Sequence, residues 1–254
     1  MRIVAELIVP SSLVIPTDHQ FISAAVYAFL SAADPVRARE LHENGYAWEH
    51  RRYKPYAFSR VVVPRRCSQY LENGDLLAHQ CVAHWFVSSP FQEVLDMFTM
   101  GLLMKGHLEL GAVRMRIKSV QTEPTPTFQA GFARLACMTP IVTTTRVDDK
   151  RLAQFVTQRD DPQKFSENIR LNLAHKYAAF FGRDAADPSL TIRFDDAFMK
   201  KHRGVEGTRF KNETVIGASA PFVVVGSPEL IQLGYDCGFG QKNALGFGMV
   251  RVNA

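Results

Sequence analysis

The chain has 254 residues, which at roughly 150 residues per domain suggests one large domain or two small ones. With 46% hydrophobic and 22% charged residues, the composition is that of a globular protein with a buried core, and it excludes disorder as the main state. No stretch approaches the ~20 apolar residues of a membrane span, so no membrane partner is expected. The 30 basic and 25 acidic residues give a net charge of +5, a mild indication of a polyanionic partner.

The N-terminal residues 1–10 lack the pattern of a signal peptide. Their apolar run carries Glu6 and ends at Pro10, with no small-residue cleavage site behind it. We therefore expect a cytoplasmic protein. The four cysteines agree, because none falls in a C-x-x-C pair and the C-x-x-H spacing of Cys81 and His84 has no second half. No disulfide framework, metal site or cofactor is expected.

The first 120 residues predict a β-α-β-β-α-β order. Apolar residues at spacings 0, 3, 4, 7 and 8 from Ile22 indicate an amphipathic helix, with Asp18 as its N-cap. The predicted strands are 2–9, 57–64, 76–87 and 107–120, and the predicted helices are 19–30 and 91–104. This order is that of the split βαβ unit found in ferredoxin-like folds.

The polar segment 122–127 contains two prolines and predicts a linker between domains 1–121 and 128–254. The second domain repeats the element order loosely, without a residue-level repeat. Its predicted strands are 132–138, 190–194, 207–213, 214–225 and 248–252, and its predicted helices are 162–181 and 228–235. The expected fold class is therefore α+β, with two tandem ferredoxin-like (RRM-like) βαββαβ domains.

The most specific pattern is the glycine-rich segment 238–248. Its glycines are Gly238, Gly240, Gly246 and Gly248. This G-x-G-x5-G-x-G spacing is expected to leave backbone amides open to a phosphate chain, with Lys242 as a central positive charge. Neither a dinucleotide-binding fingerprint nor a Walker loop fits, since Asn243 replaces the third glycine and no G-K-[ST] closes the run. The alternative is a tight connection between a helix and a strand, without a ligand.

Two further segments carry side chains suited to chemistry. His42 stands just before an Asn-Gly turn, so we expect it at the end of a short helical turn, where it can titrate near neutrality and move protons. The alternative is a surface histidine that caps a helix. Residues 50–59 interleave basic and aromatic side chains, a pattern that fits single-stranded nucleic acid. For that segment the alternative is a solvated basic loop.

Five segments in chain order resemble the CRISPR-associated endoribonucleases that cut repeat transcripts into guide RNAs (the Cas-six family of RAMP proteins). They are the first helix with Tyr27, LHENGY at 41–46, KPYAFS at 54–59, FSENIRLNLAHKY at 165–177 and SPELIQLGYDCGFGQKNALGFGMV at 227–250. The resemblance implies two tandem ferredoxin-like domains and metal-independent cleavage on the 3′ side of the repeat stem. In that reaction the 2′-OH attacks the neighbouring phosphorus and leaves a 2′,3′-cyclic phosphate and a 5′-OH.

The resemblance also implies roles for three residues. By the family's Tyr/His/Lys arrangement, His42 is the general base or acid and Lys54 stabilises charge on the phosphate. Tyr27 positions or deprotonates the 2′-OH. His50 competes with His42 for the same role, and His19 is a weaker competitor.

For RNA binding, the first candidate is the glycine-rich segment with Lys242. The second candidate is a cationic segment made of Lys200, Lys201, Arg203, Arg209 and Lys211. Its arginines can hold a phosphate bidentately, which lysine cannot. A basic strand face at 114–118 is equally well explained as a protected sheet edge or a solvated face.

The expected partner is CRISPR repeat RNA, with other CRISPR effector subunits and a homodimer as further options. One alternative function is a RAMP subunit that grips guide RNA in an effector complex without cutting it. An unrelated protein with two RRM-like sheets is disfavoured, because the RRM strand signature is absent.

Overall fold

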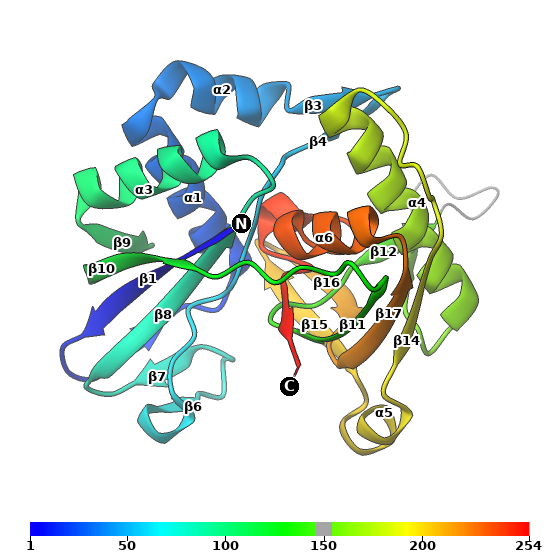
Figure 1. The fold of residues 1–254 in the computed structure, drawn as a ribbon. Helices are drawn as coiled ribbons and strands as arrows, with labels where there is room; N and C mark the ends of the chain where they lie inside the picture. Colours follow the sequence, from blue (N-terminus) through cyan, green and yellow to red (C-terminus); the bar gives the residue numbers. More distant parts are fainter. Residues whose placement is uncertain (146–153, 254) are drawn as a thin grey trace.

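The computed structural model describes residues 1–145 and 154–253. Over these residues the chain forms two α+β halves, each built on an antiparallel sheet with helices on one side (Figure 1). The larger buried side chains divide into two main hydrophobic clusters, one per half. Among the described residues, no helix is long and apolar enough to cross a membrane.

The first half has the predicted β-α-β-β-α-β order. Its main elements are β1 (Arg2–Val9), α1 (His19–Ala33), β5 (Ala57–Phe58), β8 (Cys81–Ser88), α3 (Gln92–Lys105), β9 (His107–Leu110) and β10 (Val113–Glu123). The strand order in the sheet is β5-β8-β1-β10-β9, and every pairing is antiparallel. Helices α1 and α3 cover one face; Phe29 of α1 packs on Trp85 of the sheet, and Phe98 of α3 meets Tyr56 edge to face, so the helices and the sheet share one core.

The second half repeats this topology. Its main elements are β11 (Phe132–Cys137), α4 (Pro162–Phe181), β14 (Leu190–Phe194), β17 (Pro221–Gly226), α6 (Pro228–Cys237) and β18 (Val250–Val252). The sheet order is β14-β17-β11-β18, which places the corresponding strands in the same relative positions as in the first half. Phe165 of α4 packs edge to face on Phe194 of β14. The predicted fold class is confirmed.

Smaller elements surround the two sheets. They are α2 (Pro35–Glu43), a three-stranded sheet of β2 (Leu13–Ile15), β7 (Leu76–Ala78) and β6 (Ser68–Tyr70), the hairpin of β3 (Tyr46–Trp48) and β4 (Arg51–Tyr53), the pair β12 (Thr143–Thr145) and β13 (Gln154–Val156), the hairpin of β15 (Val205–Phe210) and β16 (Glu213–Ala218), helix α5 (Asp196–His202), and the short helices η1 (Arg65–Cys67) and η2 (Asn243–Leu245). In Figure 1, α2 leads into the β3–β4 hairpin, which lies against α4 of the second half. The hairpin therefore connects the two halves.

Several predicted strands are shorter or divided. The predicted strand 57–64 is a strand only at β5, with one further bridge from Val62 to His84, and 76–87 separates into β7 and β8. The predicted strand 107–120 is the hairpin of β9 and β10, because Gly111 with φ +63° makes a tight turn between them. β10 also continues to Glu123, two residues into the predicted linker. Runs of strand-favouring residues do not show where a tight turn interrupts them.

Candidate active site

His42 owes its position to α2. Asp34 caps this helix by accepting hydrogen bonds from the backbone N–H groups of Val36 and Arg37, and Pro35 stands at its start. His42 lies in the last turn with its side chain exposed, as the sequence predicted. The helix ends there, and Gly45 with φ +56° turns the chain into the β3–β4 hairpin.

The structure brings the three predicted catalytic residues together. Lys54 follows β4 directly, and its Nζ lies 3.2 Å from Nδ1 of His42. The ring of Tyr27, on α1, lies 4.8 Å from the His42 ring, centroid to centroid. Because an ammonium group only donates, Nδ1 of His42 accepts this bond, and the neutral ring carries its proton on Nε2.

The protonation of this group follows from its surroundings. Partial burial, and after it the positive charge of Lys54, lowers the pKa of His42 below its usual value. Burial also lowers the pKa of Lys54. His42 is therefore neutral at neutral pH and available as a proton acceptor, which is the state that a general base requires.

The two competing histidines occupy different positions. His50 lies in the two-residue turn between β3 and β4, at the far end of the hairpin from Lys54, roughly 13 Å away along an extended strand. His19 is 1% exposed, with Nδ1 bonded to the carbonyl of Leu245 and Nε2 accepting from Arg60. Burial and the charge of Arg60 lower the pKa of His19 to about 3. Both ring nitrogens of His19 are thus engaged within the protein.

Contacts with α4 fix the hairpin that precedes Lys54. Trp48 stacks on His175, with ring centroids 3.8 Å apart, and Tyr46 meets Phe180 edge to face at 5.2 Å. Nη1 of Arg51 lies 3.3 Å from Nδ1 of His175. Burial, and after it the charge of Arg51, lowers the pKa of His175, so a neutral ring stacks here. The second half of the chain therefore positions a segment of the first half.

A pocket of about 520 Å³ lies between β4, α4 and the glycine-rich segment. Its lining carries arginines and a lysine from β4 and the residue after it, and two further lysines among polar and apolar residues on the other side. It consists of Arg51, Arg52, Tyr53, Lys54, Thr144, Asn172, Lys176, Gln241, Lys242, Asn243, Ala244 and Leu245. Lys54 and Lys242, predicted from separate motifs, thus face one pocket. This pocket joins the candidate catalytic group to a surface that suits a polyanion.

The glycine-rich segment is largely buried, and several of its backbone N–H groups donate within the protein instead of lying open to a ligand. The N–H groups of Phe239, Gln241 and Gly248 donate to the carbonyls of Gly248, Val142 and Pro140, at 2.8–2.9 Å. A Cβ at Gly240 would lie 2.5 Å from the carbonyl oxygen of Val142.

The segment's four glycines have positive φ and serve close packing between segments, so the local geometry is that of the tight connection. Lys242 itself is exposed and has φ +60°.

Lys176 is a residue of this site that was not predicted from the sequence. It projects from α4, is 2% exposed, and its Nζ donates to the carbonyls of Gly238 at 2.8 Å and Gly240 at 3.0 Å and to Oδ1 of Asn243 at 2.7 Å. Burial lowers the pKa of Lys176 to about 8. The available signal was a lysine three residues after Leu173, on the apolar face of a predicted helix.

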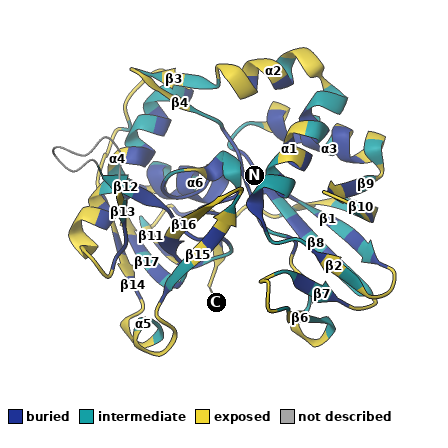
Figure 2. Cartoon of the chain, turned by 180° about the vertical axis from the view of Figure 1, so that it is seen from behind, coloured by how far each residue is buried: buried dark blue, intermediate teal, exposed yellow. Residues whose placement is uncertain are grey.

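The other predicted RNA-binding residues lie elsewhere. Arg209 is held by Asp75 at 3.0 Å and Asp18 at 3.5 Å, so its guanidinium is already paired with carboxylates. Lys211 follows it at the tip of the β15–β16 hairpin, and its backbone N–H donates to Asp18. Lys200, Lys201 and Arg203 are exposed on and just after α5, on the opposite side of the molecule from α2 and β4 (Figures 1 and 2).

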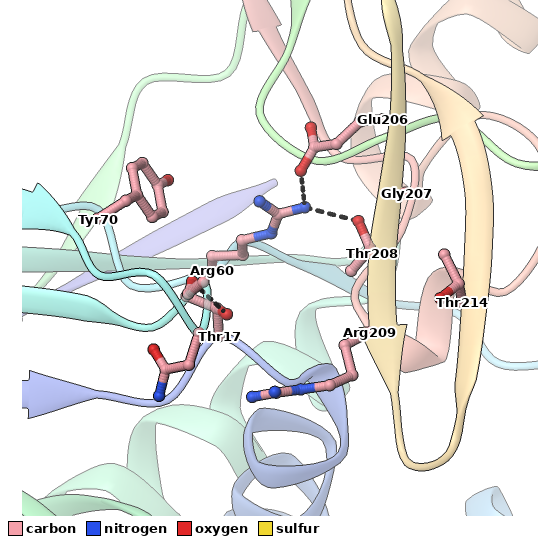
Figure 3. A pocket seen from close by; sticks show the side chains of 10 residues that line it. Thr17, Arg60, Tyr70, Glu206, Gly207, Thr208, Arg209 and Thr214 are labelled. Carbon is pink, nitrogen blue, oxygen red and sulfur yellow. Dashed lines mark hydrogen bonds and ion pairs between the residues drawn. The ribbon is translucent and has the colours of Figure 1, made fainter.

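A second pocket, of about 340 Å³, lies between the halves beside Arg209 (Figure 3). Arg60 crosses it from the first half and donates to Glu206 at 2.5 Å and to Thr208 at 2.8 Å on the β15–β16 hairpin. The two arginines of this pocket, Arg60 and Arg209, are thus paired with carboxylates of the other half and connect the two halves. Among residues 1–145 and 154–253, no group of three or more His, Cys, Asp and Glu side chains could hold a metal ion.

Two family models together match residues 14–252. Residues 14–121 match the model described as CRISPR-associated protein Cas6, N-terminal, and residues 122–252 match CRISPR associated protein Cas6, C-terminal. The chain is 30% identical over 252 residues to "CRISPR-associated endoribonuclease Cas6 1" of Methanocaldococcus jannaschii, covering 98% of this chain and 92% of that protein. The chain belongs to the Cas6 family.

Solved structures agree with this assignment. A structure titled "CRISPR associated protein Cas6" is 28% identical with a TM-score of 0.78, over 100% of this chain and 99% of that one. "An RAMP protein binding different RNA substrates" has a TM-score of 0.82 at 19% identity over 100% of both chains, which shows the same fold. The resemblance seen in the sequence is confirmed at the level of the Cas6 family.

Proposed function

We propose that this Cas6-family protein cuts CRISPR repeat transcripts into guide RNAs on the 3′ side of the repeat stem, without a metal ion. The observation that carries the proposal is the 3.2 Å contact between Lys54 Nζ and His42 Nδ1 at the edge of a basic pocket. Relatives of this chain are named endoribonucleases, and a solved relative is titled as binding RNA. Repeat RNA is therefore the proposed substrate.

The contact suggests how the reaction begins. A phosphate entering the pocket forms a charge-assisted bond with the Lys54 ammonium, stronger than the bond to a neutral imidazole. Lys54 then turns toward the phosphate, and Nδ1 of His42 is left with a free lone pair for the 2′-OH proton. The 2′-oxygen forms a bond to phosphorus while the bond from phosphorus to the 5′-oxygen breaks. Lys54 stabilises the charge that develops on the phosphate.

The leaving 5′-oxygen needs a proton, and two groups can deliver it. The His42 imidazolium formed in the first step can return its proton, or Tyr27, whose ring lies 4.8 Å from that of His42, can donate its hydroxyl proton. The products are a 2′,3′-cyclic phosphate and a 5′-OH, so no water is consumed. We also propose the division into domains 1–121 and 128–254, which the two separate hydrophobic clusters support.

The alternative is a RAMP subunit that holds guide RNA without cutting it. Such a subunit has no use for a neutral histidine held against a lysine at the edge of a basic pocket. Binding to other effector subunits or to a second copy of the chain is a separate proposal, which the cleavage experiment does not address.

The test is cleavage of labelled repeat RNA in EDTA under single-turnover conditions. Wild type is compared with His42→Ala, and the matched control is His79→Ala, an exposed histidine just after β7 whose ring nitrogen bonds to the hydroxyl of Ser12. A substrate with a single 2′-deoxy at the cut tests the nucleophile. We expect His42→Ala to lose roughly 10²–10⁴-fold in rate, the usual contribution of general acid–base catalysis, and His79→Ala to stay near wild type.

Each outcome distinguishes the alternatives. Cleavage by wild type in EDTA, abolished by the 2′-deoxy, supports the proposed chemistry. RNA that is bound but left whole favours the non-cleaving subunit. A His42→Ala variant that cuts as fast as wild type overturns the role of His42, and a loss in His50→Ala instead would transfer that role to the hairpin tip.

A further inference from the structure

Asn172 has an unusual position in the basic pocket. It lies on α4, is 6% exposed, and its Oδ1 has no hydrogen-bond partner. Buried side-chain oxygens in folded proteins are almost always paired, since an unpaired one loses its water without replacement. Asn172 also lines the pocket that Lys54 enters. The oxygen itself is buried, and a turn of the amide about the Cβ–Cγ bond brings it to the pocket side, where a bound molecule can reach it.

The other carboxamides of the pocket lining are bonded, whereas the hydroxyl of Tyr53 is, like the Asn172 oxygen, buried without a partner. Asn243, which lines the same pocket, has its oxygen bonded to Lys176 and its NH₂ group bonded to the carbonyls of Phe239 and Phe247. The hydroxyl of Thr144 donates to Oε1 of Gln241 at 2.8 Å. Within this lining, the structure satisfies the carboxamide oxygens of Asn243 and Gln241 and leaves that of Asn172 unsatisfied.

Helix α4 offers a second sign that this face meets a ligand. Asn168, Asn172 and Lys176 follow one another at four-residue spacing, so they lie on one helix face. Nδ2 of Asn168 is also buried without a partner, whereas Lys176 is fully bonded. Apolar side chains at 168 and 172 would avoid both unpaired groups, so their presence calls for a reason other than stability.

We propose that Asn172 reads a base next to the scissile phosphate, and that the Watson–Crick edge of this base presents an exocyclic amino group beside an unprotonated ring nitrogen, as in adenine and cytosine but not in guanine or uracil. The inference rests on the proposed function, because Lys54 places the scissile phosphate at this pocket. The surrounding cations, Arg52 and Lys242 among them, already supply donors for phosphate and for base carbonyls. An amino group needs an acceptor, and the unpaired acceptors of this lining are the Asn172 oxygen and the Tyr53 hydroxyl. Of the two, the Asn172 carboxamide carries its acceptor next to an NH₂ donor, as a base edge requires.

The complementary donor of Asn172 completes the match. A carboxamide presents one acceptor and one donor side by side, which fits an amino group next to a ring nitrogen. Single-stranded RNA exposes these edges, because its bases are not paired. A pocket of about 520 Å³ falls within the range of roughly 300–1,000 Å³ that small-molecule sites have.

The test varies each of the two nucleotides that flank the cut in turn, with all four bases at each. Binding is measured by fluorescence anisotropy on RNA with a 2′-deoxy at the cut, and cleavage by kcat/KM on unmodified RNA. The proteins are wild type, Asn172→Leu, Asn172→Ala and the matched control Gln163→Ala, an exposed residue in the first turn of α4. Thermal unfolding of each variant checks that it folds, and Asn172→Ala replaces Asn172→Leu should the latter not fold.

We expect wild type and Gln163→Ala to prefer adenine or cytosine at one position by roughly 10-fold or more, as one good bidentate contact provides. Asn172→Leu and Asn172→Ala should bind and cut all four bases within about 2-fold. Replacing the preferred base by its analogue without the amino group should weaken wild type and leave both Asn172 variants unchanged.

Three results would overturn this inference: no base preference in wild type, a preference retained without Asn172, or a preference for uracil or guanine. Its failure is separable from that of the proposed function. A preference that depends on Asn172, seen in binding without any cleavage, keeps this inference and rejects the enzyme. Cleavage of all bases at equal rates does the reverse, and absence of RNA binding rejects both.

Discussion

The segment around His42 and Lys54 and the glycine-rich segment 238–248 meet at one pocket, yet they are built in opposite ways. His42 is exposed, and its described partners are Lys54 and Tyr27. The glycine-rich segment is buried, and its backbone is bonded to Val142, Pro140 and Lys176. The side chains of the first segment are placed where a substrate can reach them, whereas backbone groups of the second segment form hydrogen bonds that hold the fold together. A glycine-rich pattern can therefore indicate tight internal packing rather than an open phosphate cradle.

Replacing Lys176 by methionine should test this contrast most strongly. The side-chain length is kept, but two carbonyls and the oxygen of Asn243 lose their donor inside the protein. Each buried group left unpaired costs about 1–3 kcal/mol, so we expect the free energy of unfolding in urea to fall by about 3 kcal/mol or more. The control is Lys242→Met, whose exposed side chain should change it by less than about 0.5 kcal/mol. Equal stabilities for the two variants would contradict the role of Lys176.

A smaller effect should come from adding one methyl group at Gly248. A Cβ there would overlap the carbonyl oxygen of Phe239, in a backbone with φ +75°. We expect Gly248→Ala to lower the free energy of unfolding by about 2–4 kcal/mol, combining overpacking with left-handed strain. Gly106→Ala is the matched control, because φ is +68° and nothing lies within 4 Å of the added Cβ. That variant should lose only about 1–2 kcal/mol. A similar loss at both positions would show that the packing is not tight.

The sequence predicted the elements with strong local signals well. Helix α4 has its predicted bounds, because Asp161 caps its start, Pro162 follows, and Gly182 ends it with φ +67°. Strand β14 also has its predicted bounds. The predicted strand 57–64 was longer than β5, and the predicted strand 107–120 did not include the turn between β9 and β10. The ends of these strands depend on pairing partners and turns, which the local sequence does not show. Helix α2 was expected only as a short turn, because its mean hydropathy is low and its apolar face is narrow.

The residues of the candidate site also differ in how far local sequence could predict them. Tyr27, His42 and Lys54 were named through resemblance to a family, and the structure places them together. Lys176 and Asn172 escaped notice because their significance depends on segments more than 60 residues away, such as the glycine-rich segment. Arg209 was expected to bind phosphate, but it is paired with Asp18 and Asp75, a contact that local sequence does not reveal.

The finest test of the contrast concerns the charge of Lys54 beside His42. Burial and the Lys54 charge both lower the pKa of His42, so cleavage that needs neutral His42 rises with pH through a midpoint below the usual histidine value. In Lys54→Gln the cationic contribution is lost, and the pKa of His42 should rise. It should stay below its usual value because burial persists. The acid limb of the single-turnover rate, scaled to its own plateau, should therefore move to higher pH.

Lys54→Arg keeps the charge, and its acid limb should stay near that of wild type. An unmoved limb in Lys54→Gln would mean that the two side chains do not interact in the working enzyme. A limb displaced to lower pH would reverse the sign of that interaction. Because Lys54 is half-buried and its side chain bonds to an exposed histidine, neither substitution should lower the free energy of unfolding by more than about 1 kcal/mol. Thermal unfolding can check this, and the pH profile then reports on the chemistry of the pair alone.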